Sequence, residues 1–298
     1  MPRLAIAVWV AIALIGAGCS ADPADDGRIR VVATTTILGD VASNVAGSDA
    51  DVEVLMPIGA SPHGFVPSSQ QVAKIYTADL VVANGLDLEA GLADVLEAAK
   101  GDGVNVLEVA PHLDPLPFGD GDDLDPHVWM DPMRMMDTAR LIATELTAVA
   151  PSVDWEGNAD AYAAELQSTH NTIQQLLGAI PTDQRKLVTN HDSLGYFADR
   201  YGFVVIGTVI PGGSSLGDPS SAALAELVAV IERERSPAIF AESTEPQALA
   251  DAVAAEAGAD VAVVELFTGS LSEPGTVADT LIGMLLVDAE RIAKALGS

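Results

Sequence analysis

Histidines are the residues of this 298-residue chain best suited to chemistry, and five are present. Three of them, His63, His127 and His191, lie in segments rich in Pro, Gly, Asp or Asn, although they are widely separated in the chain. A neutral imidazole is a good ligand for zinc and also binds manganese, iron, nickel or copper. A lone loop histidine more often makes a hydrogen bond in a turn, so the spacing alone leaves a shared site open. No local helix or hairpin could join the three, and any shared site must be assembled by the whole fold.

The other two histidines have simpler interpretations. His112 follows Pro111 in a predicted loop, and His170 lies within a long predicted helix, where we expect its ring to be exposed. Neither position indicates a metal ligand.

The segments that must position these residues alternate between short apolar strands and amphipathic helices. Strands that are apolar on both faces are typical of a parallel sheet covered by helices. The first half of the chain predicts strands over 29–34, 52–56, 79–83 and 104–109, and helices over 37–46, 68–77 and 88–100. The second half predicts strands over 186–190, 203–209, 238–241 and 261–266, and helices over 194–201, 220–234, 247–256 and 276–296.

Two long helical stretches, Pro132–Val149 and Trp155–Leu177, separate these halves. We therefore predict an α/β fold with an N-terminal lobe over residues 29–150 and a C-terminal lobe over 185–298. Each lobe has a parallel-type sheet flanked by helices, and one long linking helix within 151–184 joins them. The cleft between two such lobes is where ligands prefer to bind.

The beginning of the chain has the layout of a secretory signal. An arginine precedes an apolar run that is too short for a comfortable membrane span, and small residues follow it. Residues 16–19, GAGC, resemble a bacterial lipobox, although Gly16 replaces the usual Leu. We expect residues 1–18 to be removed, Cys19 to carry a lipid, and residues 19–28 to form a flexible tether. Ordinary secretion without a lipid is the alternative interpretation.

Composition excludes several classes of protein. The net charge of −29 leaves nothing that could neutralise a run of phosphates, so nucleic acid is excluded as a partner. Cys19 is the only cysteine, which excludes an intrachain disulfide framework and a thiolate metal cluster. No segment after residue 20 is apolar over a sufficient length to span a bilayer, so the chain is not itself a channel.

Local sequence around the histidines is more specific than their spacing. The segments SPHGFVPSSQQV, DPHVWMDP and NHDSLGYFADRYG closely resemble the metal-binding solute-binding lipoproteins of bacterial ABC importers, the zinc and manganese family. The resemblance continues through FAESTEP and ELFTGSLSEPG, over about residues 30–296. It implies that His63 and His127 of the first lobe and His191 of the second lobe bind one divalent ion. It also implies a rigid linking helix, an importer permease and ATPase as partners, a monomer, and a location at the extracytoplasmic face of the membrane.

One departure from the family concerns the fourth ligand. Many relatives supply an Asp where this chain has Gly269. We expect water there, or a substitute carboxylate, for which Glu242 is the candidate. Glu242 could instead bond to a histidine ring. Because manganese prefers more oxygen ligands, the loss of the Asp favours zinc over manganese.

Two other functions are compatible with parts of the sequence. A zinc hydrolase could also use three histidines and an open coordination position. However, the chain has no HExxH, GxSxG or helix-opening GxGxxG motif, and we predict that it is not an enzyme. A surface adhesin would leave the three ligand motifs without a role, so we expect adhesion only as an additional property.

Overall fold

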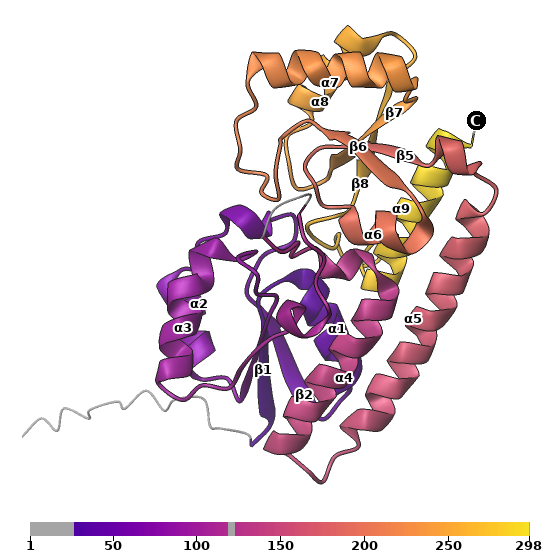
Figure 1. Ribbon diagram of the computed structural model, residues 1–298. Coiled ribbons are helices and arrows are strands. Elements are labelled where there is room, and N and C mark those ends of the chain that lie inside the picture. The colour runs from indigo at the N-terminus through magenta and orange to yellow at the C-terminus, as the bar shows by residue number, and fades with distance from the viewer. Residues whose placement is uncertain (1–26, 119–122, 298) are drawn as a thin grey trace, which may run out of the picture.

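The computed structural model describes residues 27–118 and 123–297, which form two α/β lobes, one above the other (Figure 1). The predicted signal peptide, Cys19 and most of the tether lie outside these residues. The predicted fold class is confirmed, because each lobe contains a four-stranded sheet whose strands pair in parallel. No helix in the described part of the chain has both the length and the apolar character needed to cross a membrane.

The N-terminal lobe has the strand order β2-β1-β3-β4, and its strands are β1 (Ile29–Ala33), β2 (Ala50–Val54), β3 (Leu80–Ala83) and β4 (Val106–Glu108). Its helices are α1 (Thr36–Ala46), α2 (Ser69–Tyr76), α3 (Ala93–Gly101) and α4 (Pro132–Val149). β3 is buried at all four positions, as expected for a strand with helices on both faces of its sheet. Asp131 caps the start of α4, and Pro132 occupies the first turn, where no backbone N–H is needed.

The C-terminal lobe has the strand order β6-β5-β7-β8, and its strands are β5 (Lys186–Thr189), β6 (Val204–Thr208), β7 (Ala238–Glu242) and β8 (Ala262–Leu266). Its helices are α6 (Gly195–Tyr201), α7 (Ser221–Glu234), α8 (Ala248–Ala257) and α9 (Leu281–Leu296). Helix α5 (Trp155–Leu177) runs along one side of the molecule between the two lobes (Figure 1).

Two predicted helices begin later than their sequence pattern indicated. In place of the first part of the helix predicted from residue 88, the chain forms a 3-10 turn, η2 (Ala90–Leu92), and α3 follows it. The regular helix begins late because the Glu89 carboxylate accepts hydrogen bonds from the backbone N–H groups of Asn84 and Gly85 in the preceding loop. The helix predicted from residue 276 begins at Leu281 instead. There the Thr280 side chain caps the helix by accepting from the backbone N–H of Gly283.

One hydrophobic core runs through both lobes. It includes Val31 of the first sheet, Ile142 of α4, Leu166 of α5 and Phe240 of the second sheet. Two smaller clusters cover the opposite face of each sheet. Helix α9 belongs to this shared core, because it packs against β7 and β8 and also against α5 and α1. Close-packed interiors deform little, so the shared core opposes a large hinge motion between the lobes.

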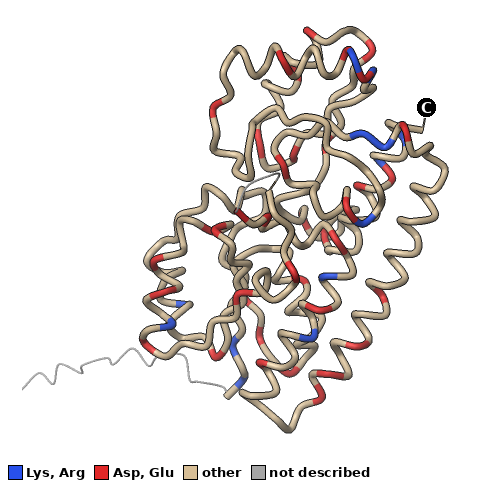
Figure 2. The backbone as a smooth tube through the Cα atoms, in the orientation of Figure 1, with Lys and Arg blue, Asp and Glu red and all other residues tan. Residues whose placement is uncertain are grey.

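Acidic residues lie over both lobes and along α5, whereas basic residues are few (Figure 2). This distribution agrees with the strongly negative net charge. A surface of this kind keeps the protein soluble and enriches cations near it, but it does not select a ligand.

Candidate metal centre

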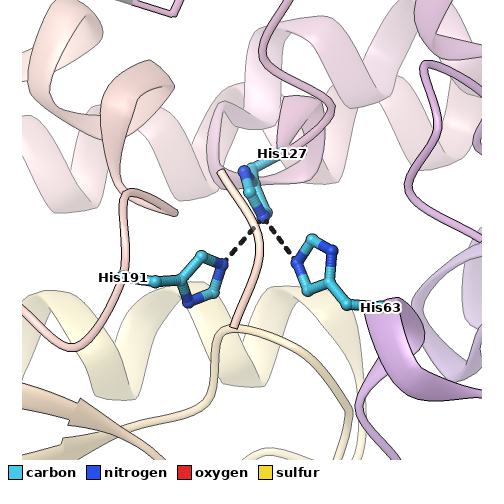
Figure 3. Close-up of side chains that lie close together, drawn as sticks. All are labelled: His63, His127 and His191. Carbon is cyan, nitrogen blue, oxygen red and sulfur yellow. Dashed lines mark hydrogen bonds between the residues drawn. The ribbon is translucent and has the colours of Figure 1, made fainter. Parts of the chain in front are cut away.

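The structure brings the three predicted histidines together between the lobes. His63 lies in the 3-10 turn η1 (Pro62–Gly64) after β2, His127 directly precedes the turn η4 (Val128–Met130), and His191 follows β5. Nε2 of His127 lies 3.2 Å from Nε2 of His63 and 3.1 Å from Nε2 of His191 (Figure 3). One ring nitrogen of each histidine lies within 4.8 Å of the others. Among residues 27–118 and 123–297, these three side chains form the group with metal-ligand geometry.

These separations fit a shared ion. A tetrahedral zinc site with Zn–N distances near 2.0–2.1 Å places its nitrogens about 3.3 Å apart. The two Nε2–Nε2 distances are close to this value, and the three ring centroids are 5.0, 5.1 and 5.3 Å apart. A single ion among the rings therefore needs only small side-chain movements.

A buried carboxylate orients His127. Oδ1 of Asp125 accepts a hydrogen bond from the backbone N–H of His127 at 2.9 Å and lies 2.8 Å from Nδ1 of its ring. Burial raises the pKa of Asp125 to about 7, while the hydrogen bond from His127 opposes that rise. Burial also lowers the pKa of His127 well below its usual value, which favours the neutral ring. With Nδ1 toward Asp125, Nε2 is the nitrogen that faces the other two rings.

Glu242 backs His191 through a close ion-pair contact. Glu242 is the last residue of β7, the neighbour of β5 in the sheet, and its Oε1 lies 2.5 Å from Nδ1 of His191. The hydroxyl of Ser193 donates to the same oxygen at 2.8 Å. Burial lowers the pKa of His191, but the charge and contact of Glu242 outweigh it, so the pKa is raised overall. Glu242 thus contacts the nitrogen of His191 that is remote from the shared centre, and its oxygens are not among the grouped ligand atoms.

His63 is held in its neutral form by its surroundings. Burial, together with the positive charge that His127 and His191 could carry, lowers its pKa to about 3. It is 7% exposed, against 1% for His127 and 2% for His191. A cavity of about 570 Å³ opens beside it, lined by residues of both lobes that include Asp87, Phe118 and Leu216. This cavity gives a small ion a path from solvent to the His63 side of the centre.

Gly269, the residue where many relatives have Asp, is tightly packed. A Cβ atom at this position would lie 2.8 Å from Oγ1 of Thr244 and 3.5 Å from Pro62, the neighbour of His63. The preceding carbonyl, of Thr268, accepts a 2.7 Å hydrogen bond from the indole of Trp129, whose ring lies 5.3 Å from that of His127. The segment therefore borders the centre, but the side chain of Thr244 fills the space that a residue larger than glycine would need.

The remaining histidines lie away from this group. His112 is exposed in a 3-10 turn. His170 is half-buried, so the prediction of an exposed ring was wrong, because its ring stacks on Tyr201 of α6 at a centroid distance of 5.6 Å. Neither is among the grouped ligand atoms.

Sequence reasoning missed the groups that orient the rings. Asp125 stands in the DPH motif but carries no predicted role, and the sequence patterns do not predict a role for Ser193 or Trp129. The Asp two residues before His127 is the one signal that could have been used. The contacts of Ser193 and Trp129 depend on how the strands and lobes are placed, which no local pattern records.

Comparison with known proteins gives a consistent family. Residues 31–295 match the family model described as zinc-uptake complex component A, periplasmic. The chain is 32% identical over 295 residues to the manganese-binding lipoprotein MntA of Halalkalibacterium halodurans, covering 97% of each chain. It is also 32% identical over 285 residues to the zinc-binding protein TroA of Treponema pallidum, covering 93% of this chain and 92% of TroA.

Solved structures agree with the sequence comparison. The periplasmic zinc-binding protein TroA from Treponema pallidum superposes with a TM-score of 0.86 at 28% identity, covering 91% of this chain and all of that one.

The sequence comparison does not select the ion. MntA and TroA are each 32% identical to this chain, yet one is named for manganese and the other for zinc.

Proposed function

We propose a function from the premise that this chain belongs to the family of zinc-uptake complex component A, as its motifs predicted. The protein captures one divalent transition-metal ion outside the cytoplasm and delivers it to an ABC importer. The observation that carries this proposal is the convergence of three buried imidazole nitrogens at a point between the lobes. The permease that receives the ion is the expected partner, and we propose that the protein acts as a monomer.

His63, His127 and His191 are the proposed ligands, each through Nε2. Asp125 and Glu242 orient two of these rings from behind, and the negative charge of Glu242 balances the ion. This assignment gives Glu242 an orienting role instead of the alternative role as fourth ligand. Water is the proposed fourth ligand, because Gly269 carries no donor atom.

Zinc is the proposed cargo, with manganese as the alternative. Three imidazoles and one water make a four-coordinate site, which zinc accepts readily. Manganese favours oxygen-rich sites of higher coordination number. No carboxylate from the described ranges, 27–118 and 123–297, belongs to the group of ligand atoms. The donor set therefore supports zinc.

Titration of metal-stripped protein tests this assignment. Isothermal calorimetry with zinc and with manganese should give one site per chain and tighter binding of zinc. His63→Ala, His127→Ala and His191→Ala should each weaken binding strongly, whereas His112→Ala and His170→Ala are matched controls that should not. Unchanged binding in the three ligand variants would refute the site, and a clear manganese preference would refute only the choice of metal.

Membrane attachment through Cys19 is a separate part of the proposal. The tether would hold the protein at the outer face of the cell membrane, beside the permease. Expression of the full chain and of its Cys19→Ala variant, followed by detergent phase partition, tests it. The wild type should enter the detergent phase and the variant the aqueous phase; equal partition of both would exclude lipidation at this residue.

A further inference from the structure

Helix α6 lies against the segment that carries His127, and it begins four residues after His191 in the chain. Residues 125–131, which contain His127, are called the His127 loop below. His127 is the central ligand, because its Nε2 is near the Nε2 atoms of both other histidines. Contacts that hold the His127 loop against α6 therefore also hold His127 close to His191.

The first end of the loop is bonded to Tyr196. The hydroxyl of Tyr196 donates to the backbone carbonyl of Asp125 at 2.6 Å and accepts from the backbone N–H of Leu116 at 3.0 Å. Tyr196 is buried, so both bonds are shielded from water. The carbonyl that it holds belongs to the residue whose carboxylate orients His127.

Arg200 is bonded to the other end of the loop. Its Nε and Nη2 donate to the two carboxylate oxygens of Asp131 at 3.0 and 2.7 Å, a bidentate pair. Asp131 is 1% exposed, and its Oδ1 also accepts from the backbone N–H of Met133 at the start of α4. A buried carboxylate is costly without such partners, so this pair resists separation.

The first residue of α6 also touches the loop. A Cβ atom on Gly195 would lie only 2.5 Å from Oδ2 of Asp125. Glycine here lets the helix approach the carboxylate that orients His127, and the helix backbone limits where that carboxylate can move.

We propose that α6 is a clamp that holds the His127 loop against the His191 loop and sets how fast the ion leaves. This inference rests on the proposed function, because it takes His127 and His191 as ligands. Tyr196 and Arg200 are positioning residues: neither touches the ion, and each fixes one end of the loop. Moving His127 away from His191 requires these bonds to break, so their loss should act mainly on the dissociation rate.

The test compares variants of these two residues with matched controls. Tyr196→Phe and Arg200→Met remove one tie each, and Arg200→Lys keeps the charge without the bidentate geometry. Tyr162→Phe removes another buried tyrosine bond, to Asp40, and Arg140→Met removes a surface ion pair with Asp137. Zinc release to an excess of chelator is timed by stopped flow. The absorption spectrum of the cobalt-loaded protein reports coordination, and the melting temperature of the metal-free protein reports stability.

Tyr196→Phe and Arg200→Met should each release zinc about fivefold to tenfold faster than wild type, a change equivalent to the loss of about one hydrogen bond. Arg200→Lys should fall between Arg200→Met and wild type, and the two controls should release zinc at the wild-type rate. The cobalt spectrum should keep its three-nitrogen character in all of them. Clamp variants that lower the metal-free melting temperature but release zinc as slowly as the controls would overturn the clamp. Failure of the wild type to bind zinc or cobalt would instead overturn the proposed function.

Discussion

Replacing Glu242 by Gln should weaken metal binding through His191, by an amount that can be worked out from the structure. Oε1 of Glu242 lies 2.5 Å from Nδ1 of His191. Adding the width of the ring and a Zn–N bond places the ion about 6.5 Å from this carboxylate. Glutamine keeps an oxygen acceptor at this position and removes the charge.

The carboxylate charge of Glu242 contributes a different free energy of zinc binding at different pH, because the zinc ion competes with a proton for His191. When His191 is protonated in the metal-free protein, zinc binding replaces the single positive charge of that proton by the two positive charges of the ion. With an effective dielectric constant of about 20, one additional charge at about 6.5 Å is stabilised by about 2.5 kcal/mol. That corresponds to about 70-fold in affinity, within the range of about 10–100-fold found for groups that orient metal ligands. When His191 is neutral, the ion adds both charges, and the loss should be larger.

The assay is a competition titration of zinc between each protein and a chelator of known affinity, from pH 6 to pH 8. The ratio of the dissociation constants, Glu242→Gln over wild type, should exceed tenfold and should grow as pH rises. His191 should also titrate at lower pH in the variant, because Glu242 raises its pKa. A ratio near one, or one that falls with rising pH, would refute the orienting role. Loss of a ligand from the cobalt spectrum would point to Glu242 as a direct ligand instead.

Three further outcomes are expected. Zinc affinity of the wild type should fall as pH drops below the pKa of His191, because this ring must lose its proton to bind the ion, whereas the pKa of His63 is already about 3. An affinity that does not change with pH, measured by the same competition, would contradict this. Gly269→Asp alone should lower the melting temperature, because the new Cβ atom would clash with Thr244. The double variant Gly269→Asp with Thr244→Ala should fold, and its manganese-to-zinc affinity ratio in calorimetry should be higher than that of the wild type. An unchanged ratio in the folded double variant would count against Gly269 as a determinant of metal choice. Burial raises the pKa of Asp288 to about 7, so Asp288 binds a proton more tightly in the folded protein than in the unfolded chain, and its contribution to stability falls as pH rises from about 4 to 7. Relative to wild type, the Asp288→Asn variant should therefore gain most in melting temperature at pH 7 and least near pH 4. An equal effect at both pH values would show that Asp288 is not buried as a neutral acid.

Much of the fold could be predicted from sequence because its strands are short and apolar throughout. Leu80–Ala83 is buried at every position, and a run of this kind with helices before and after it has few other interpretations. The same reasoning failed for the start of α3, where Glu89 bonds to Thr34 and to the loop backbone. A helical pattern in the sequence does not show that a side chain has a long-range partner that ends the regular structure.

The centre was predictable only in part, for a related reason. The three histidines stand in motifs that identify them individually, so their convergence followed from the family resemblance. Apart from Asp125, which stands two residues before His127, the groups that hold the ligands act across strands or between lobes. Glu242 reaches His191 from a neighbouring strand, and Arg200 reaches Asp131 from the other lobe. Such contacts depend on the three-dimensional placement of elements that are far apart in sequence, and an arginine on a short helix gives no local sign of its partner.

The distribution of restraints around the centre also indicates which ligand has the most freedom. A core shared by both lobes opposes a large change in their separation, so the differences between the loaded and the empty protein must lie mainly in the ligand segments. His127 and His191 are each backed by a buried carboxylate, and α6 holds their loops together. His63 lies in a short turn, is the most exposed of the three, and borders the cavity. Because the restraints concentrate on two ligands and the opening lies beside the third, we infer that the ion enters and leaves past His63, and that the bonds of α6 control how long it stays.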